Sequence, residues 1–178
     1  PIGALWGYVF DGVYMTQEEF ESQPKHATSE VGTVRMKDVN NDGIIDADDR
    51  TIIGNPTPDA IFGMTNEFKY KNFDLSILLQ GQIGGDIMNA NLEDQHNLDG
   101  VFNVSTEVKD RWRSEENPGN GLVPKTKTGT TELYRLGNSG WVYDASYLSI
   151  KNVTLGYTVP LKSRDLISRL RFYITMQN

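Results

Sequence analysis

The chain has 178 residues and a formal net charge of -7, with 24 acidic and 17 basic side chains. This is the size of one ordinary domain, and the acidic balance argues against nucleic-acid binding, because phosphate contacts need clustered Lys and Arg. The chain contains no cysteine, which excludes disulfides, Cys-ligated zinc and a thiol nucleophile. No uncharged apolar run of about 18 residues is present, so the sequence predicts no membrane-spanning helix, whereas spanning strands remain compatible with it.

The first predicted elements are short. Residues 5–10 are aromatic and contain Gly, which is typical of a short strand. Thr16 and Glu19 match a capping box and predict a brief helix through about Ser22, ended by Pro24. The chain begins without an initiator Met and without a signal peptide pattern, and it stops directly after a strand-like run. We therefore expect it to be a piece of a longer polypeptide.

Residues 38–49, which follow an extended stretch at 31–37, fit the twelve-residue calcium loop of EF-hand and dockerin type. Oxygen-bearing side chains fall at loop positions one, three, five, nine and twelve, Gly43 allows the sharp turn at the sixth, and a backbone carbonyl serves at the seventh. The predicted metal ligands are Asp38, Asn40, Asp42, Ile44, Asp46 and Asp49.

Two features set this loop apart from a paired calcium sensor. Its last position is Asp49 instead of the usual Glu. We also expect only a short helix at 46–53, ended by Gly54 and Pro56, in place of long flanking helices. The sequence thus predicts a static, stabilising calcium clip, and the alternative is an Asp/Asn/Gly turn that needs no metal.

Residues 61–83 predict an amphipathic β-hairpin. Apolar and polar residues alternate in both arms, apart from Asn66 and Leu78, and Lys71 and Asn72 form a polar break suited to a tight turn. Each arm has about 10 residues, the length that a tilted strand needs to cross a bilayer.

Residues 84–146 are polar and rich in Gly, Asn and Asp, and we expect a long loop region with one short helix from Ser105 to Trp112. Residues 147–178 predict a second amphipathic hairpin, with a bulge near Lys151 where the alternation changes phase. Outer-membrane barrels combine short turns on one side with long extracellular loops on the other, so this asymmetry favours a barrel.

The predicted fold class is all-β: antiparallel amphipathic hairpins that form part of an outer-membrane barrel, with long extracellular loops and one or two short helices. The alternative is a secreted, soluble, calcium-stabilised β binding module, in which the apolar strand faces meet in a small sandwich. We do not expect an enzyme, because no acid, base or nucleophile constellation stands out in the sequence.

Several segments, taken in order, resemble the C-terminal barrel region of the SusC/RagA family of TonB-linked outer-membrane proteins. The longest matches are YKNFDLSI at 70–77 and YLSIKNVTLGY at 147–157. The other matching pieces are residues 7–8, 11–14, 34–37, 38–46, 49–50, 53–58, 80–81, 111–112 and 177–178. Together they cover nearly the whole chain.

This resemblance implies a bacterial outer-membrane importer of glycans or peptides, with an N-terminal plug inside a barrel of about 22 strands. It implies outer-membrane lipid around the strands, a SusD-like surface lipoprotein as lid, and a TonB complex that acts through an N-terminal part outside these residues. The calcium loop would lie on the extracellular side. With about four to six strands the chain cannot close such a barrel, and its outermost strands would have unpaired edges.

Overall fold

The computed structural model describes residues 3–96, 103–125, 132–161 and 167–178. The chain divides into two compact units. Unit 1 consists of Pro1–Pro56 and Asp86–Asp144, and unit 2 consists of Thr57–Gly85 and Ala145–Asn178. Within the described ranges, no helix is both long and apolar enough to cross a membrane.

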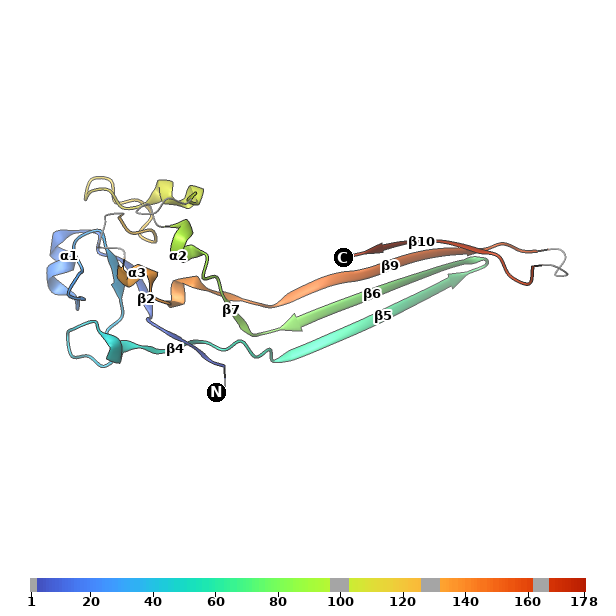
Figure 1. Cartoon of the computed structure of the whole chain (residues 1–178), viewed down its shortest axis with the longest axis horizontal. Coiled ribbons are helices and arrows are strands. Elements are labelled where there is room, and N and C mark those ends of the chain that lie inside the picture. The colour runs from blue at the N-terminus through green and yellow to red at the C-terminus, as the bar shows by residue number, and fades with distance from the viewer. Residues whose placement is uncertain (1–2, 97–102, 126–131, 162–166) are drawn as a thin grey trace. The chain divides into compact units, whose positions relative to one another are not determined.

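Unit 2 is a single antiparallel sheet (Figure 1). Its strands are β5 (Ala60–Tyr70), β6 (Phe73–Ile83), β9 (Tyr147–Thr158) and β10 (Arg171–Gln177), and they lie side by side in the order β10-β9-β6-β5. Both predicted hairpins are therefore confirmed, and β6 and β9 pair with each other to join them. Within the described part of the chain, β5 and β10 each have one edge without a partner strand.

The turn and the bulge of this sheet lie where the sequence predicts them. Tyr70 pairs with Phe73, so that two residues form the turn, and Lys71 adopts a positive φ of 52°. The register of β6 against β9 shifts between Leu78, which faces Asn152, and Leu79, which faces Ile150. This shift leaves Lys151 as the extra residue of a β-bulge, which bends and twists the strand locally.

Unit 1 is built from short elements. Its strands form three antiparallel pairs, β1 with β4, β2 with β3 and β7 with β8. The strands are β1 (Leu5–Gly7), β2 (Phe10–Val13), β3 (Val34–Met36), β4 (Thr51–Gly54), β7 (Asp86–Met88) and β8 (Val142–Asp144). The helices are α1 (Gln17–Ser22), α2 (Leu92–Gln95), α3 (Glu132–Arg135) and the 3-10 turns η1 (Ala47–Asp49), η2 (Thr106–Asp110) and η3 (Ser139–Trp141).

The hydrophobic core lies in unit 1. A cluster of buried side chains joins Val34, Met36 and Ile45 from the first part of the chain to Leu133 and Tyr134 from the region at 84–146. That region, which the composition indicated to be loop-like, also buries Leu92, Val108, Val123 and Trp141. All hydrophobic residues that are buried in the described ranges belong to unit 1, so the sheet of unit 2 has no core of its own.

One local prediction is wrong. Residues 46–53 do not form one helix, because the 3-10 turn η1 ends at Asp49 and strand β4 begins at Thr51. Thr51 and Ile52 pair with Gly7 and Trp6 of β1, and this long-range pairing overrides the local helical pattern. The helix expected from Ser105 lies in the predicted place as η2, with the Ser105 hydroxyl accepting from the Glu107 amide at 3.3 Å.

Candidate functional site

The sheet of unit 2 has one apolar and one polar face. Residues paired directly across neighbouring strands point to the same face, so the register assigns every side chain. The apolar face carries Ala60, Phe62, Met64, Asn66, Phe68, Tyr70, Phe73, Leu75, Ile77, Leu79, Gly81, Ile83, Leu148, Ile150, Val153, Leu155, Tyr157, Phe172, Ile174 and Met176. Asn66 is the one polar side chain among them. The alternation predicted from the sequence therefore produces a continuous apolar surface across four strands.

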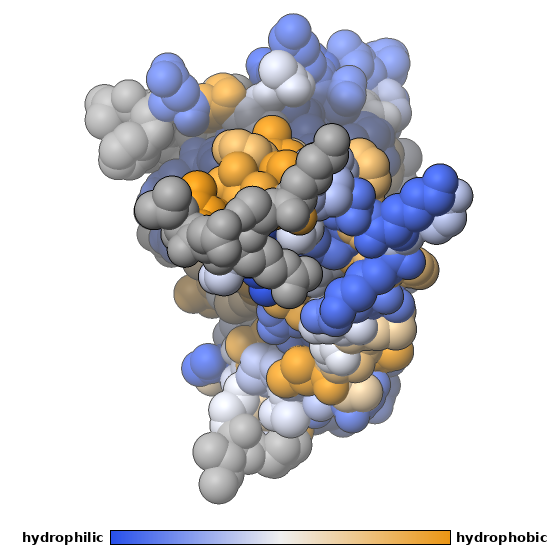
Figure 2. All heavy atoms as spheres, turned by 90° about the vertical axis from the view of Figure 1, so that its right-hand side faces the viewer, coloured by the Kyte–Doolittle hydropathy of each residue, from blue (hydrophilic) through white to orange (hydrophobic). Residues whose placement is uncertain are grey.

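This apolar surface is exposed. Phe68 is 58% exposed, Leu148 69% and Ile174 71%, values far from those of core residues. Seen from the side of the β5–β6 turn, hydrophobic side chains remain at the molecular surface beside hydrophilic ones (Figure 2). A patch of this size calls for a covering medium or partner. In the described residues the sheet does not form the sandwich of the soluble alternative, which would bury these side chains.

An aromatic row marks the turn end of the apolar face. Tyr70, Phe73, Tyr157 and Phe172 lie side by side across all four strands, and the rings of Phe73 and Tyr157 are 4.8 Å apart between centroids. Aromatic girdles of this kind flank the apolar band of outer-membrane barrels. The 11 residues of β5 span about 36 Å, or roughly 26 Å along the membrane normal at a tilt of about 45°. This matches an apolar band of about 25 Å.

The opposite face is mostly polar, and it carries an ion pair that the sequence analysis missed. Asp74 of β6 binds Arg171 of β10 through two hydrogen bonds, the longer one being 3.1 Å from Nε. The pair reaches across Gly156 of the intervening strand β9, where a Cβ atom would lie 2.3 Å from Nη2 of the arginine. A side chain at position 156 would therefore force the ends of Asp74 and Arg171 to move. Only the register of three strands reveals it.

The predicted calcium loop forms a tight turn on the surface of unit 1. Asn41 and Gly43 adopt positive φ angles of 62° and 86°, as the sharp reversal requires. The Asp38 carboxylate accepts hydrogen bonds from the amides of Asn41 at 2.6 Å and Gly43 at 2.8 Å. The Asp42 carboxylate accepts from the Ile44 amide at 2.9 Å. These contacts hold the first half of the loop.

Asp49, the predicted last ligand, joins the two ends of the loop. Its carboxylate is fully buried and accepts from the Val39 amide at 2.7 Å and the Asp46 amide at 2.9 Å. The neighbouring Ile45 enters the core and pairs its amide with the Lys25 carbonyl at 3.1 Å. The loop is thus attached to unit 1 at both ends, while its middle is exposed.

The residue types of this loop suit calcium, but its side chains are not gathered around one point. The five oxygen-bearing side chains and the turned backbone are those that calcium loops use. Among the residues that the structure describes, however, no three acidic, histidine or cysteine side chains come together closely enough to hold a metal ion. The carboxylates of the loop instead accept hydrogen bonds from backbone amides. Calcium binding therefore stays a prediction.

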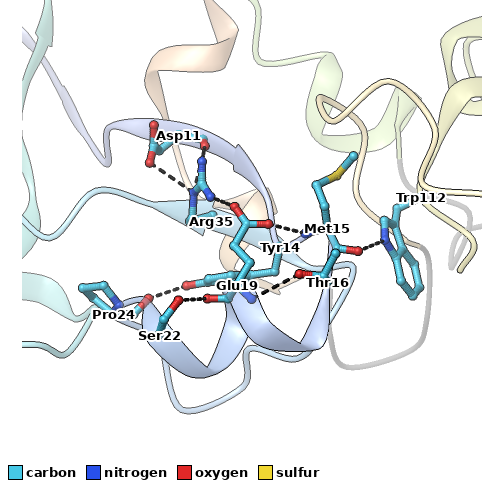
Figure 3. A network of polar contacts seen from close by, with 9 residues as sticks. All are labelled: Asp11, Tyr14, Met15, Thr16, Glu19, Ser22, Pro24, Arg35 and Trp112. Atoms are coloured by element: carbon cyan, nitrogen blue, oxygen red, sulfur yellow. Dashed lines mark hydrogen bonds and ion pairs between the residues drawn. The ribbon is translucent and has the colours of Figure 1, made fainter. Parts of the chain in front are cut away.

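A polar network connects the first elements of unit 1 (Figure 3). Arg35 of β3 donates to the Asp11 carbonyl at 2.7 and 3.0 Å and forms ion pairs with Asp11 and Glu19. The Glu19 carboxylate also accepts from the Met15 amide at 2.7 Å. The capping box predicted for α1 is therefore half formed, since Thr16 accepts from the Glu19 amide but Glu19 reaches the residue before the cap.

Two aromatic residues extend this network. Tyr14 is completely buried, and its hydroxyl donates to the Pro24 carbonyl at 2.5 Å, while burial raises the pKa of its phenol. Trp112 donates from Nε1 to the Met15 carbonyl at 3.1 Å, which ties the region after η2 to the start of α1 (Figure 3). The network fixes distant segments of unit 1 and contains no group arranged for chemistry on a substrate, so we assign it a structural role.

Comparison with known proteins gives relatives for nearly the whole chain, although no family model matches it. TonB-dependent receptor P26 of Formosa agariphila is 34% identical over 178 residues, which are 97% of this chain and 17% of that receptor. TonB-dependent receptor SusC of Bacteroides thetaiotaomicron is 27% identical over 162 residues, which are 85% of this chain and 14% of that receptor. The chain therefore spans about a sixth of the length of these relatives.

The fold has solved counterparts as well. The RagAB peptide importer in its closed-closed state matches with a TM-score of 0.68 and 18% identity, over 98% of this chain and 19% of that one. A second structure of the RagAB peptide transporter matches with a TM-score of 0.66. These matches cover both units, and they agree with the exposed apolar face and the aromatic row of the sheet. The chain belongs to the SusC/RagA family of TonB-linked outer-membrane β-barrel proteins.

Proposed function

We propose that this chain forms part of the barrel wall of a TonB-dependent importer that carries nutrients across the bacterial outer membrane. The observation that supports the proposal most directly is the exposed apolar face that continues over all four strands, opposite a mostly polar face. In a membrane barrel the first face meets outer-membrane lipid and the second borders a watery interior. In the part of the chain that the structure describes, β5 and β10 each have an edge without a partner strand, and these edges would pair with neighbouring strands of the complete barrel.

The lengths of the connections between the strands indicate which end of the sheet faces the outside of the cell. A two-residue turn links β5 to β6, whereas the connection from β6 to β9 contains the whole segment Asp86–Asp144 of unit 1. Outer-membrane barrels place short turns in the periplasm and long connections outside the cell. We therefore assign unit 1, including the loop at 38–49, to the extracellular side, where a SusD-like lipoprotein would cover the importer and where cargo would arrive.

The cargo in this proposal is a glycan or a peptide, and the energy comes from the periplasmic TonB complex through a part of the receptor outside this chain. The test is an uptake assay in cells that lack the native receptor. Cells given the complete receptor should accumulate labelled oligosaccharide or peptide only while TonB is active. If the complete receptor stays in solution without detergent, or restores uptake without TonB, the importer proposal is wrong.

We further propose that the loop at 38–49 binds a structural calcium ion. Asp38, Asn40, Asp42, Asp46 and Asp49 would hold it through side-chain oxygens, together with the carbonyl of Ile44. The bound ion would offset part of the negative charge of a loop that carries five aspartates within 12 residues. The buried attachment of Asp49 and Ile45 supports a stabilising role, because order in the loop would be transmitted directly to the core of unit 1.

The test of this proposal is a calcium titration of the complete receptor in detergent, followed by calorimetry and by chemical unfolding. With a dissociation constant of about 0.1 mM, which is typical of extracellular calcium modules, 10 mM calcium should stabilise unit 1 by about 2.7 kcal/mol. Asp42→Asn should abolish the heat of binding. Asp48→Asn, at an exposed position of the same loop that is not a predicted ligand, should leave it intact. Equal stability with calcium and with EDTA would exclude a structural ion.

A further inference from the structure

Unit 1 contains a pocket that the barrel architecture does not explain. Its volume is about 430 Å³, within the range of small-molecule sites. The walls come from distant segments: Phe10 of β2, Tyr134 of α3 and Tyr143 of β8 supply aromatic rings, and Leu122 adds an aliphatic side. Tyr134 is buried, whereas Tyr143 and Leu122 are 50% and 58% exposed and therefore lie toward the mouth. We call this the His96 pocket.

The pocket takes its name from a histidine that no sequence pattern singles out, since its neighbours in the chain are polar. His96 is only 7% exposed. Its ring lies nearly parallel to the ring of Tyr134, with 6.1 Å between centroids and 6° between planes. Its Nδ1 lies 2.7 Å from the Tyr134 hydroxyl, and its Nε2 lies 2.8 Å from the Glu107 carboxylate. All three residues line the pocket.

These contacts define the direction of each hydrogen bond. An ionised carboxylate only accepts, so Nε2 of His96 carries a proton and donates to Glu107. In the neutral imidazole Nδ1 then accepts, and the Tyr134 hydroxyl donates to it. Burial raises the pKa of Tyr134 to about 12, so this hydroxyl keeps its proton throughout the physiological range. The two hydrogen bonds, from Tyr134 to His96 and from His96 to Glu107, hold the Glu107 carboxylate in place.

The result is an aromatic pocket with one positioned negative charge. The Glu107 side chain is 65% exposed, and in the described residues no lysine or arginine forms an ion pair with it, while His96 contacts it through the hydrogen bond assigned above. The other polar group of the lining, Asn120, is neutral, and its carboxamide oxygen already accepts from the amides of Leu122 and Val123. Aromatic faces attract cations, and a carboxylate forms strong charge-assisted hydrogen bonds with ammonium and guanidinium groups. A cationic ligand would therefore gain a charge-assisted contact here that a neutral ligand cannot form.

We propose that the His96 pocket binds a cationic group on an apolar stem, such as the guanidinium or ammonium of a basic residue in a peptide cargo. Glu107 pairs with the cation, and the rings of Phe10 and Tyr143 contact the stem. This inference rests on the proposed importer function and narrows it, because it selects peptides that carry a basic residue over neutral glycans.

The test compares two ligands of nearly equal shape, arginine amide and citrulline amide with its N-terminus acetylated in both, so that they differ in the side-chain charge. Binding to the complete receptor in detergent is measured by calorimetry, with no need for TonB. Arginine should bind at least about tenfold more tightly, as expected for a charge-assisted contact. Glu107→Gln should remove this preference, and Glu18→Gln, the same change at an exposed site on α1 outside the pocket, should preserve it.

A second variant separates a loss of binding from a loss of folding. Tyr143→Ala removes an exposed wall of the pocket and leaves the Tyr134–His96–Glu107 contacts in place, and it should weaken arginine binding about tenfold with unchanged thermal unfolding. Equal binding of arginine and citrulline, binding of maltotriose in their place, or an unchanged preference in Glu107→Gln would each overturn the proposal. Because binding and uptake are separate measurements, tight arginine binding without TonB-dependent uptake would sustain the pocket and count against the importer.

Discussion

A lysine placed on the apolar face of the sheet tests the membrane assignment, and its cost should depend on depth. Ile77 lies four residues from Phe73, the β6 member of the aromatic row, or about 13 Å along the strand. At a tilt of about 45° this is roughly 9 Å along the normal of a band about 25 Å thick, close to the midplane. Ile77→Lys should therefore cost about 2–4 kcal/mol, and Phe73→Lys, at the interface, only about 0–1 kcal/mol.

Ser76→Lys provides the matched control, since Ser76 is the neighbour of Ile77 on the polar face. A lysine there borders the watery interior and should change the unfolding free energy by less than about 0.5 kcal/mol. The measurement is equilibrium unfolding of the complete receptor in phospholipid vesicles, followed by tryptophan fluorescence. Equal costs at positions 73 and 77 would indicate a protein core instead of lipid, because a core has no depth gradient, and equal costs at 76 and 77 would refute the assignment of the two faces.

Two further predictions concern single contacts. Gly156→Ala should weaken the Asp74–Arg171 contact and lower the stability of the sheet, because the new Cβ atom would lie within 2.6 Å of both side chains, and in a double-mutant cycle the same change should cost less in an Arg171→Met background. Because burial raises the pKa of Tyr134 to about 12, the unfolded chain loses this proton first, so the unfolding free energy should fall as pH rises from about 10 to 12. Tyr134→Phe should flatten that slope in alkaline unfolding curves, at the cost of the hydrogen bond to His96 near neutral pH, and an unchanged slope would assign the effect to another group.

Period-two alternation is the strongest local signal in this chain, and it accounts for what the sequence could predict. The register places every apolar residue of β5 and β6 except Ile61 and Leu78 on one face, and the phase change near Lys151 is the bulge itself. In these hairpins the position of a residue along its strand is enough to predict its environment, because successive side chains point alternately to the two faces of the sheet. No distant residue is needed to decide its environment.

The structure of unit 1, by contrast, depends on contacts between distant parts of the sequence. Its strands have three or four residues, too few to show a period, and its core joins residues separated by about a hundred positions. For that reason the region at 84–146 looks like loop, Thr51 pairs as a strand where a helix was expected, and the burial of His96 gives no local sign.

The sequence by itself therefore determined the hairpins, the two faces of the sheet, the family and the pattern of the loop at 38–49. Tertiary structure alone decided the core of unit 1, the Asp74–Arg171 pair across Gly156 and the His96 pocket. The physical reason is that alternation is a property of neighbours along the chain, whereas burial and pairing in short elements depend on which distant segments meet.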